Sequence, residues 1–185
     1  MNLMIKVIAL LGPAGSGKDT ILNLALEKIP QLSRVVSYTT RPQREGEQDG
    51  VHYNFIDYEE FSEKLLSNTM KEAAVFNHWG YGTDASCYKE DKVNIIALDP
   101  TRCSLLLENK DMKVYPYIVS ATPKVRLLRQ LKREDNPNVD EIIRRYETDK
   151  KDFEFIPFPY YTLPNENKTD LKAAIETIRA LVKSI

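Results

Sequence analysis

A glycine-rich segment near the start of the chain constrains the fold more than any other part of the sequence. Residues 12–20 read Gly-Pro-Ala-Gly-Ser-Gly-Lys-Asp-Thr, and they directly follow a short apolar run rich in β-branched residues, Ile5–Leu11. A run of this kind predicts a strand that is buried on both faces, as in a parallel sheet. After the glycines, apolar residues recur at helical spacing until Pro30, which predicts a helix over Lys18–Lys28.

The spacing Gly-x4-Gly-Lys between a strand and a helix is typical of a loop that binds nucleotide phosphates. Glycines let successive backbone N–H groups turn inward around an anion, and the following helix adds its positive dipole end. Lys18 is expected to bridge the β- and γ-phosphates of ATP and is a predicted catalytic residue. Asp19 stands where Ser or Thr is usual, so the Thr20 hydroxyl is the predicted contact to a phosphate or, through water, to Mg²⁺. The predicted ATP-binding residues of the loop are Gly12, Pro13, Ala14, Gly15, Ser16, Gly17, Lys18, Asp19 and Thr20.

The rest of the chain alternates between short apolar runs and amphipathic segments. Such alternation predicts an α/β protein, a three-layer P-loop fold with helices on both sides of a mostly parallel central sheet. The further expected elements are strands over Asn94–Leu98 and Val114–Val119, a helix from Pro123 to about Lys132 that Thr122 can cap, and a last helix over about Thr169–Ser184.

Two stretches interrupt this alternation. Residues 37 to about 90 are long, polar and rich in tyrosine, and Asp57 followed by Glu60 predicts the start of a short helix inside them. Residues 133 to 140 are charged, contain Asn-Pro and connect two helical patterns, as a mobile lid does. With 185 residues the chain suits one domain. We therefore expect a single domain over 1–185, with a core of 1–36 and 91–185, an acceptor-binding insertion over about 37–90 and a lid over about 133–140.

The composition excludes several classes of partner. The formal net charge of −1 gives no global attraction to nucleic acid or to an anionic membrane. Two isolated cysteines and two histidines make a structural zinc site improbable. The apolar run at the N-terminus is too short to span a membrane. We expect a cytoplasmic protein, a monomer or a homodimer, whose partners are small molecules.

A second cluster of polar residues is suited to bind the molecule that accepts the phosphate. Residues 37–47 read Ser-Tyr-Thr-Thr-Arg-Pro-Gln-Arg-Glu-Gly-Glu, Asp49-Gly50-Val51-His52-Tyr53 follows, and Glu72 and Tyr81-Gly82-Thr83 come later. Arginine forks and tyrosine hydroxyls suit a monophosphate dianion, while a carboxylate and hydroxyls suit the donor and acceptor edge of guanine. With the phosphate loop, this ordered set resembles the guanylate kinase family, which transfers phosphate from ATP to GMP, and the resemblance covers nearly the whole chain.

The resemblance implies a role for each of these residues. It implies that the GMP phosphate contacts Arg41, Arg44, Tyr53 and Tyr81, that Glu47 orients the arginines, and that Ser37, Glu72 and Thr83 read the base. Arg41 also counts as a predicted catalytic residue because it neutralises charge at the reacting phosphates. Taken singly, each has a plainer interpretation, such as a surface ion pair for Arg41 and Glu47 or sheet packing for Tyr53.

The chain departs from the family after the expected strand 94–98. The family carries Asp-x-Asp there, and this chain has Ala97 and Asp99, which leaves Asp99 as a candidate for contact with guanine or for indirect contact with Mg²⁺. The family usually has Gln-Gly shortly after, where this chain has Pro100-Thr101-Arg102.

The lid supplies further expected contacts. By resemblance, Arg133 and Arg145 stabilise the transferring phosphoryl group, whereas Arg129 and Arg144 are expected to be helix-surface arginines paired with nearby acids. Asn165 falls in the loop that borders adenine in the family.

The expected function is ATP-dependent phosphorylation of GMP, and of dGMP, by direct in-line transfer with Mg²⁺. Two alternatives remain open. One is a related small-molecule kinase such as ribose 1,5-bisphosphate phosphokinase. The end of the glycine loop, Gly17-Lys18-Asp19-Thr20, resembles the loop of that enzyme. The other is a non-catalytic guanylate-kinase-like interaction module, which typically lacks a working phosphate loop.

Overall fold

The computed structural model describes residues 4–44, 46–133 and 135–185. Residues 1–3, 45 and 134, which fall in the expected core, insertion and lid, lie outside the described residues.

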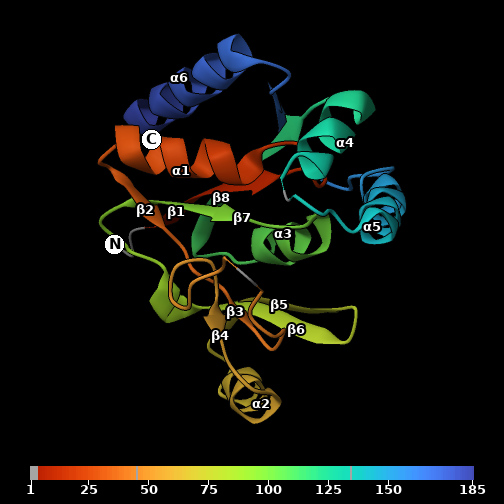
Figure 1. Cartoon of the computed structure of the whole chain (residues 1–185). Helices are drawn as coiled ribbons and strands as arrows, with labels where there is room; N and C mark the ends of the chain where they lie inside the picture. Colours follow the sequence, from red (N-terminus) through yellow and green to blue (C-terminus); the bar gives the residue numbers. More distant parts are fainter. Residues whose placement is uncertain (1–3, 45, 134) are drawn as a thin grey trace.

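A five-stranded parallel sheet forms the centre of the molecule (Figure 1), in the order β2-β7-β1-β8-β9. Its middle strand is the apolar run before the glycine loop, and Val7 to Leu11 are fully buried there. Because helices cover both faces of the sheet, this central strand is buried on both faces, which explains its unbroken apolar sequence. The strands are β1 (Ile5–Leu11), β2 (Leu32–Arg34), β7 (Val93–Ala97), β8 (Met112–Ser120) and β9 (Tyr161–Pro164).

Helices cover both faces of this sheet, as the alternating sequence predicts. On one face α1 (Lys18–Lys28) and α6 (Lys168–Ser184) pack side by side over a core that includes Ile21 and Ile178. On the other face α3 (Pro100–Leu107) packs through Cys103 and Leu106. The predicted α/β fold with a mostly parallel central sheet is confirmed.

A second sheet lies below the first in Figure 1, with strands in the order β4-β3-β6-β5. Its strands are β3 (Tyr38–Thr39), β4 (Asn54–Phe55), β5 (Met70–Phe76) and β6 (Trp79–Asp84), and α2 (Tyr58–Leu66) and a 3₁₀ turn (Ala85–Cys87) accompany them. The Asp57 carboxylate accepts a hydrogen bond from Glu60 N, so the predicted helix start is confirmed. Helix α3 contacts β5 and so joins this sheet to the core.

Two helices flank the expected lid, α4 (Pro123–Leu131) and α5 (Val139–Asp152). Thr122 occupies the N-cap position and Pro123 begins α4, as predicted, but the Thr122 side chain forms no hydrogen bond to the first turn. The hydroxyl instead donates to the Glu166 carboxylate, because the loop after β9 lies beside this helix end. Among the described residues, no helix is long and apolar enough to cross a membrane.

Candidate active site

The glycine loop adopts a conformation that other residues resist. Gly15 and Gly17 have φ angles of 78° and 91°, in the left-handed region. A Cβ on Gly15 would lie 2.9 Å from the Cα of Arg126, so the close approach of α4 also requires glycine. Gly17 occupies the N-cap position of α1, which places the helix N-terminus at the loop, as an anion site requires.

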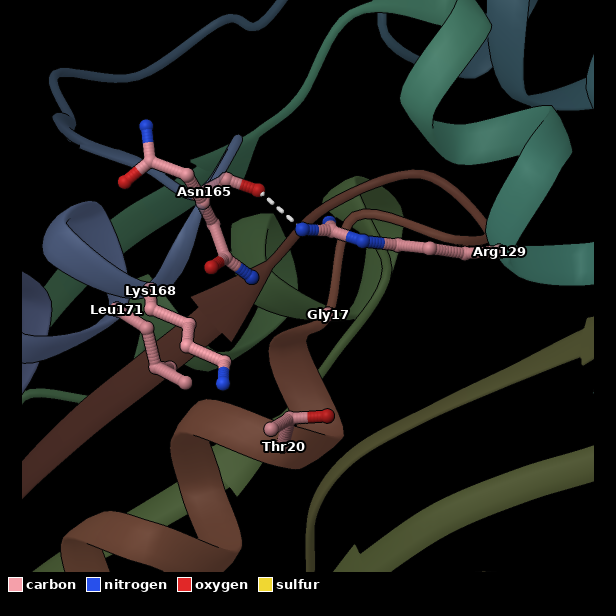
Figure 2. Close-up of a pocket in the computed structure, with 7 residues that line it drawn as sticks. Gly17, Thr20, Arg129, Asn165, Lys168 and Leu171 are labelled. Carbon is pink, nitrogen blue, oxygen red and sulfur yellow. Dashed lines mark hydrogen bonds between the residues drawn. The ribbon is translucent and has the colours of Figure 1, made fainter.

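Two side chains from later in the chain hold the carbonyl side of this loop (Figure 2). Asn165 is buried and donates from Nδ2 to Ser16 O at 2.8 Å. Arg129 donates from Nη1 to Gly15 O and Ser16 O and from Nη2 to Asn165 O. The expected pairing of Arg129 with a nearby acid is wrong: this guanidinium donates to carbonyl oxygens of the loop and of Asn165 and so satisfies their hydrogen-bonding capacity.

A small cavity of about 250 Å³ opens beside these contacts. Its walls carry Gly17, Thr20, Arg129, Asn165, Asn167, Lys168 and Leu171. Thr20 is exposed at this opening, whereas Lys18 and Asp19 line a separate, larger cavity.

The larger cavity, of about 940 Å³, joins the phosphate loop to the second sheet and to the helices around the lid. It brings together predicted residues that lie up to 133 positions apart in the sequence. The predicted residues that line it are Gly12, Ala14, Gly15, Lys18, Asp19, Ser37, Arg41, Arg44, Tyr53, Tyr81, Asp99, Arg133 and Arg145. Glu47, Glu72 and Thr83 lie behind this wall, where they contact lining residues. One cavity therefore holds both the loop lysine and the predicted acceptor side chains.

Several arginines line the part of this cavity next to the second sheet. Arg41 donates from Nη1 and Nη2 to the two carboxylate oxygens of Glu47, at 3.0 and 2.8 Å. Although burial alone would lower it, this carboxylate raises the pKa of Arg41 above its usual value. Arg44 is exposed, and burial of its guanidinium together with the nearby charges of Arg145 and Arg41 lowers its pKa. Mutually repelling cations of this kind are stabilised by an anion such as a phosphate dianion.

Aromatic rings lie beside the Arg41 guanidinium. The Arg41 guanidinium lies 5.6 Å from the ring centre of Tyr53 and 5.5 Å from that of Phe55. Tyr53 packs edge-on against Tyr81, with ring centres 5.9 Å apart, and burial raises the pKa of the Tyr53 hydroxyl. Both tyrosines line the cavity, where a phenol hydroxyl can donate a hydrogen bond.

The residues expected to read the base form a buried network with a cation that sequence reasoning missed. Arg102, on α3, donates from Nε and Nη2 to the Glu72 carboxylate, both at 2.7 Å. Nη2 also lies 2.8 Å from Ser37 Oγ and 3.1 Å from Thr83 Oγ1. Ser37 and Thr83 bond to each other at 2.9 Å, and Thr83 also donates to Glu72. The sequence signal that could have indicated the burial of Arg102 is its position on the same helical face as Cys103 and Leu106.

Asp99 caps the start of α3. Its Oδ1 accepts from the backbone N–H of Arg102 at 2.9 Å, while the residue remains exposed and lines the large cavity. The cap orients this carboxylate at the carboxyl end of the β7 segment, the edge at which α/β proteins bind ligands.

Helices α4 and α5 present the remaining predicted residues. Arg133 is exposed at the end of α4 and lines the large cavity. Arg145 donates from Nε to Glu141 at 2.7 Å, and Arg144 forms the expected surface ion pair with the same carboxylate. Asp149, also on α5, accepts from Ala14 N at 2.6 Å and lies 3.3 Å from Arg126.

The side chains that could assist a metal are oxygen donors, the ligands that Mg²⁺ prefers. Asp99 and Asp152 line the same cavity as Lys18. Over the described residues, however, no group of three or more His, Cys, Asp or Glu side chains is arranged to hold a metal by itself. This donor set fits an ion that arrives with nucleotide phosphates.

Comparison with known proteins agrees with this geometry. A family model described as guanylate kinase matches residues 4–184. The chain belongs to the guanylate kinase family. A guanylate kinase from Helicobacter pylori (strain J99 / ATCC 700824) is 34% identical over 129 residues, which are 62% of this chain and 63% of that relative. The match thus spans less than two thirds of that relative's length.

Two further relatives cover more of the chain. A guanylate kinase from Clostridium perfringens (strain SM101 / Type A) is 30% identical over 177 residues, 93% of this chain and 81% of the relative. The crystal structure of guanylate kinase from Anaplasma phagocytophilum aligns with a TM-score of 0.70 at 18% identity, over 98% of this chain and 86% of that chain. The second likeness shows the shared fold, and together they confirm the resemblance inferred from the sequence.

Proposed function

We propose that this guanylate kinase family member transfers the γ-phosphate of ATP to the phosphate of GMP, and of dGMP. The observation that carries the proposal is that Lys18 lines the same large cavity as the cations Arg41, Arg44 and Arg145. Phosphoryl transfer depends on positioning and on neutralising charge rather than on a side-chain nucleophile. This arrangement supplies both.

In the proposed reaction, the backbone N–H groups of residues 12–20 and the Lys18 ammonium hold the ATP phosphates. Asn165 and Arg129 keep the loop carbonyls turned away from those phosphates. Arg41, fixed by Glu47, and Arg44 bind the acceptor phosphate, with Tyr53 and Tyr81 as neutral donors. An acceptor oxygen then attacks the γ-phosphorus in line with the departing ADP oxygen.

The lid region completes the proposed site. Arg133 and Arg145 lie on either side of residues 134–138, and closure would bring their charges onto the equatorial oxygens of the transferring group. Closure also expels water, which protects ATP from hydrolysis. Mg²⁺ bound by the ATP phosphates, with Thr20 reached through water, would neutralise further charge there.

The Arg102–Glu72 pair favours a second candidate, an acceptor that carries phosphate but no guanine. Ribose 1,5-bisphosphate belongs to this class. Arg41, Arg44 and the tyrosines would still bind its phosphate, whereas the base-reading carboxylate is already occupied.

The test is ADP release from ATP-Mg²⁺ with GMP, dGMP, AMP, CMP, UMP and ribose 1,5-bisphosphate offered separately. Turnover with GMP or dGMP alone supports the first candidate, and turnover with the sugar bisphosphate alone supports the second. If no acceptor is phosphorylated, a titration with ATP follows, because an interaction module without catalysis should lack magnesium-dependent ATP binding.

A further inference from the structure

Arg102 lies in the acceptor pocket among the side chains that the family resemblance assigns to guanine. Its side chain is 3% exposed and points from α3 toward the second sheet. The guanidinium donates to Ser37, Glu72 and Thr83, which are all three of the predicted base-reading residues. The predicted base subsite is therefore filled by a residue of the chain itself.

The chemistry of this contact matches the chemistry of guanine. Guanine offers a carboxylate its N1–H and N2–H₂ groups, whose nitrogens are both bonded to one carbon. Arginine offers Nε–H and Nη2–H₂, whose nitrogens are also bonded to one carbon, and in Arg102 they meet Oε2 and Oε1 of Glu72 at 2.7 Å each. A base cannot form the same two bonds while the guanidinium holds both oxygens.

Arg102 keeps its charge in this contact. Glu72 is 3% exposed, and its carboxylate outweighs the effect of burial and raises the pKa of Arg102, so the guanidinium stays charged. Asp99 fixes the same residue through its backbone N–H. Separating a buried ion pair without replacing both partners is unfavourable, so a ligand that displaces Arg102 binds more weakly than one that leaves it in place.

We propose that Arg102 is a specificity-determining residue that competes with guanine for Glu72. A guanine nucleotide then fills the base subsite only after the guanidinium has left the carboxylate. An acceptor held through its phosphate and ribose meets Arg41 and Arg44 without disturbing Arg102. The inference rests on the proposed function for the location of the acceptor pocket, and it deepens that function by naming what selects the acceptor.

The test is calorimetric binding of GMP and of ribose 5-phosphate to the full chain without ATP. In Arg102→Ala, which suits a helix and keeps the Asp99 cap, the Kd for GMP should fall by at least about tenfold, because Glu72 is freed for the base. The Kd for ribose 5-phosphate should change by less than about twofold. Arg179→Ala, which removes an ion-paired surface arginine on α6, is the matched control and should change neither constant.

Two further variants secure the interpretation. Adding Glu72→Gln to Arg102→Ala should abolish the gain in GMP affinity, since the gain depends on the carboxylate. If Arg102→Ala is poorly folded in a thermal melt, Arg102→Gln should give the same change in GMP affinity. The proposal is overturned if GMP affinity is unchanged or weaker in the folded variants, or if the gain survives the loss of the Glu72 carboxylate.

This result is separable from the proposed function. A wild-type chain that phosphorylates GMP, with no change in GMP affinity on removing Arg102, supports the function and overturns the role of Arg102. Tighter GMP binding in Arg102→Ala without phosphorylation of any acceptor supports the role of Arg102 and contradicts the function.

Discussion

The carboxylate of Asp149 accepts a hydrogen bond of 2.6 Å from the backbone N–H of Ala14, so helix α5 contacts the phosphate loop directly. N–H groups of such a loop are anion sites, and a carboxylate on one of them occupies a position suited to a phosphate oxygen. Because α5 also carries Arg145, this contact joins the glycine loop to a helix that lines the large cavity.

We predict that Asp149→Asn binds ATP-Mg²⁺ about three- to tenfold more tightly than the wild type, because the neutral amide removes a negative charge beside the phosphates. A titration with a fluorescent ATP analogue measures the change. Asp111→Asn, which alters a surface ion pair with Lys71, is the control and should leave ATP affinity unchanged. Weaker ATP binding in Asp149→Asn would show that the carboxylate supports the loop rather than competing with phosphate.

Substitution of Lys18 tests whether the predicted phosphate loop acts in catalysis. It lines the large cavity at the start of α1, and its ammonium is the positive charge expected at the γ-phosphate. Lys18→Ala should lower kcat by about a thousandfold or more, because charge neutralisation is lost in the transition state. Lys28→Ala, at the exposed end of the same helix, should keep wild-type turnover. Equal activity in the two variants would contradict the proposed mechanism.

Substitution of Arg129 tests whether this side chain stabilises the conformation of that loop. Its guanidinium donates hydrogen bonds to the carbonyl oxygens of Gly15, Ser16 and Asn165. A shorter side chain could not reach all three. Arg129→Ala should destabilise the fold by about 1–3 kcal/mol, since charged hydrogen bonds to partly buried carbonyls are lost, and it should raise the KM for ATP. Urea unfolding and ATP kinetics measure the two effects. Arg144→Ala, which removes only a surface ion pair, should cost less than about 1 kcal/mol.

The sequence predicted those parts of the fold whose signals are local. The buried strand β1, the glycine loop and helix α1 are contiguous, so periodicity and spacing identified them together. The predicted acceptor side chains form an ordered set in the sequence, and five of them, Ser37, Arg41, Arg44, Tyr53 and Tyr81, line one cavity.

The contacts that the sequence did not reveal join residues far apart in the chain. Arg102 meets Glu72 across 30 positions, Arg129 meets Gly15 across 114, and Asp149 meets Ala14 across 135. In each case the residue lies on a helix where a charged side chain ordinarily faces solvent. Only the packing of α3, α4 and α5 against the sheets and the loop shows that these charges point inward.

The stability that Glu141 contributes to the fold is expected to depend on pH. Hydrogen bonds from Arg144, and then from Arg145, lower the pKa of this carboxyl to about 2, against an ordinary value of 4.5. A carboxyl whose pKa is lower in the folded state stabilises the fold above its ordinary pKa, and that contribution is lost as the pH falls toward the folded value. Compared with the wild type, Glu141→Gln should therefore be less stable at pH 7, and the difference should shrink below pH 4.5. Since about a third of the side chain is exposed, the difference at pH 7 should be under about 1 kcal/mol.

Urea unfolding of the wild type and Glu141→Gln at pH 7, 5, 4 and 3 measures this difference. Arg144→Gln removes the largest cause of the lowered pKa, so its loss of stability should follow the same course with pH. A difference that stays constant from pH 7 to pH 3 would mean that Glu141 stabilises α5 through packing or helix propensity, because neither depends on its ionisation.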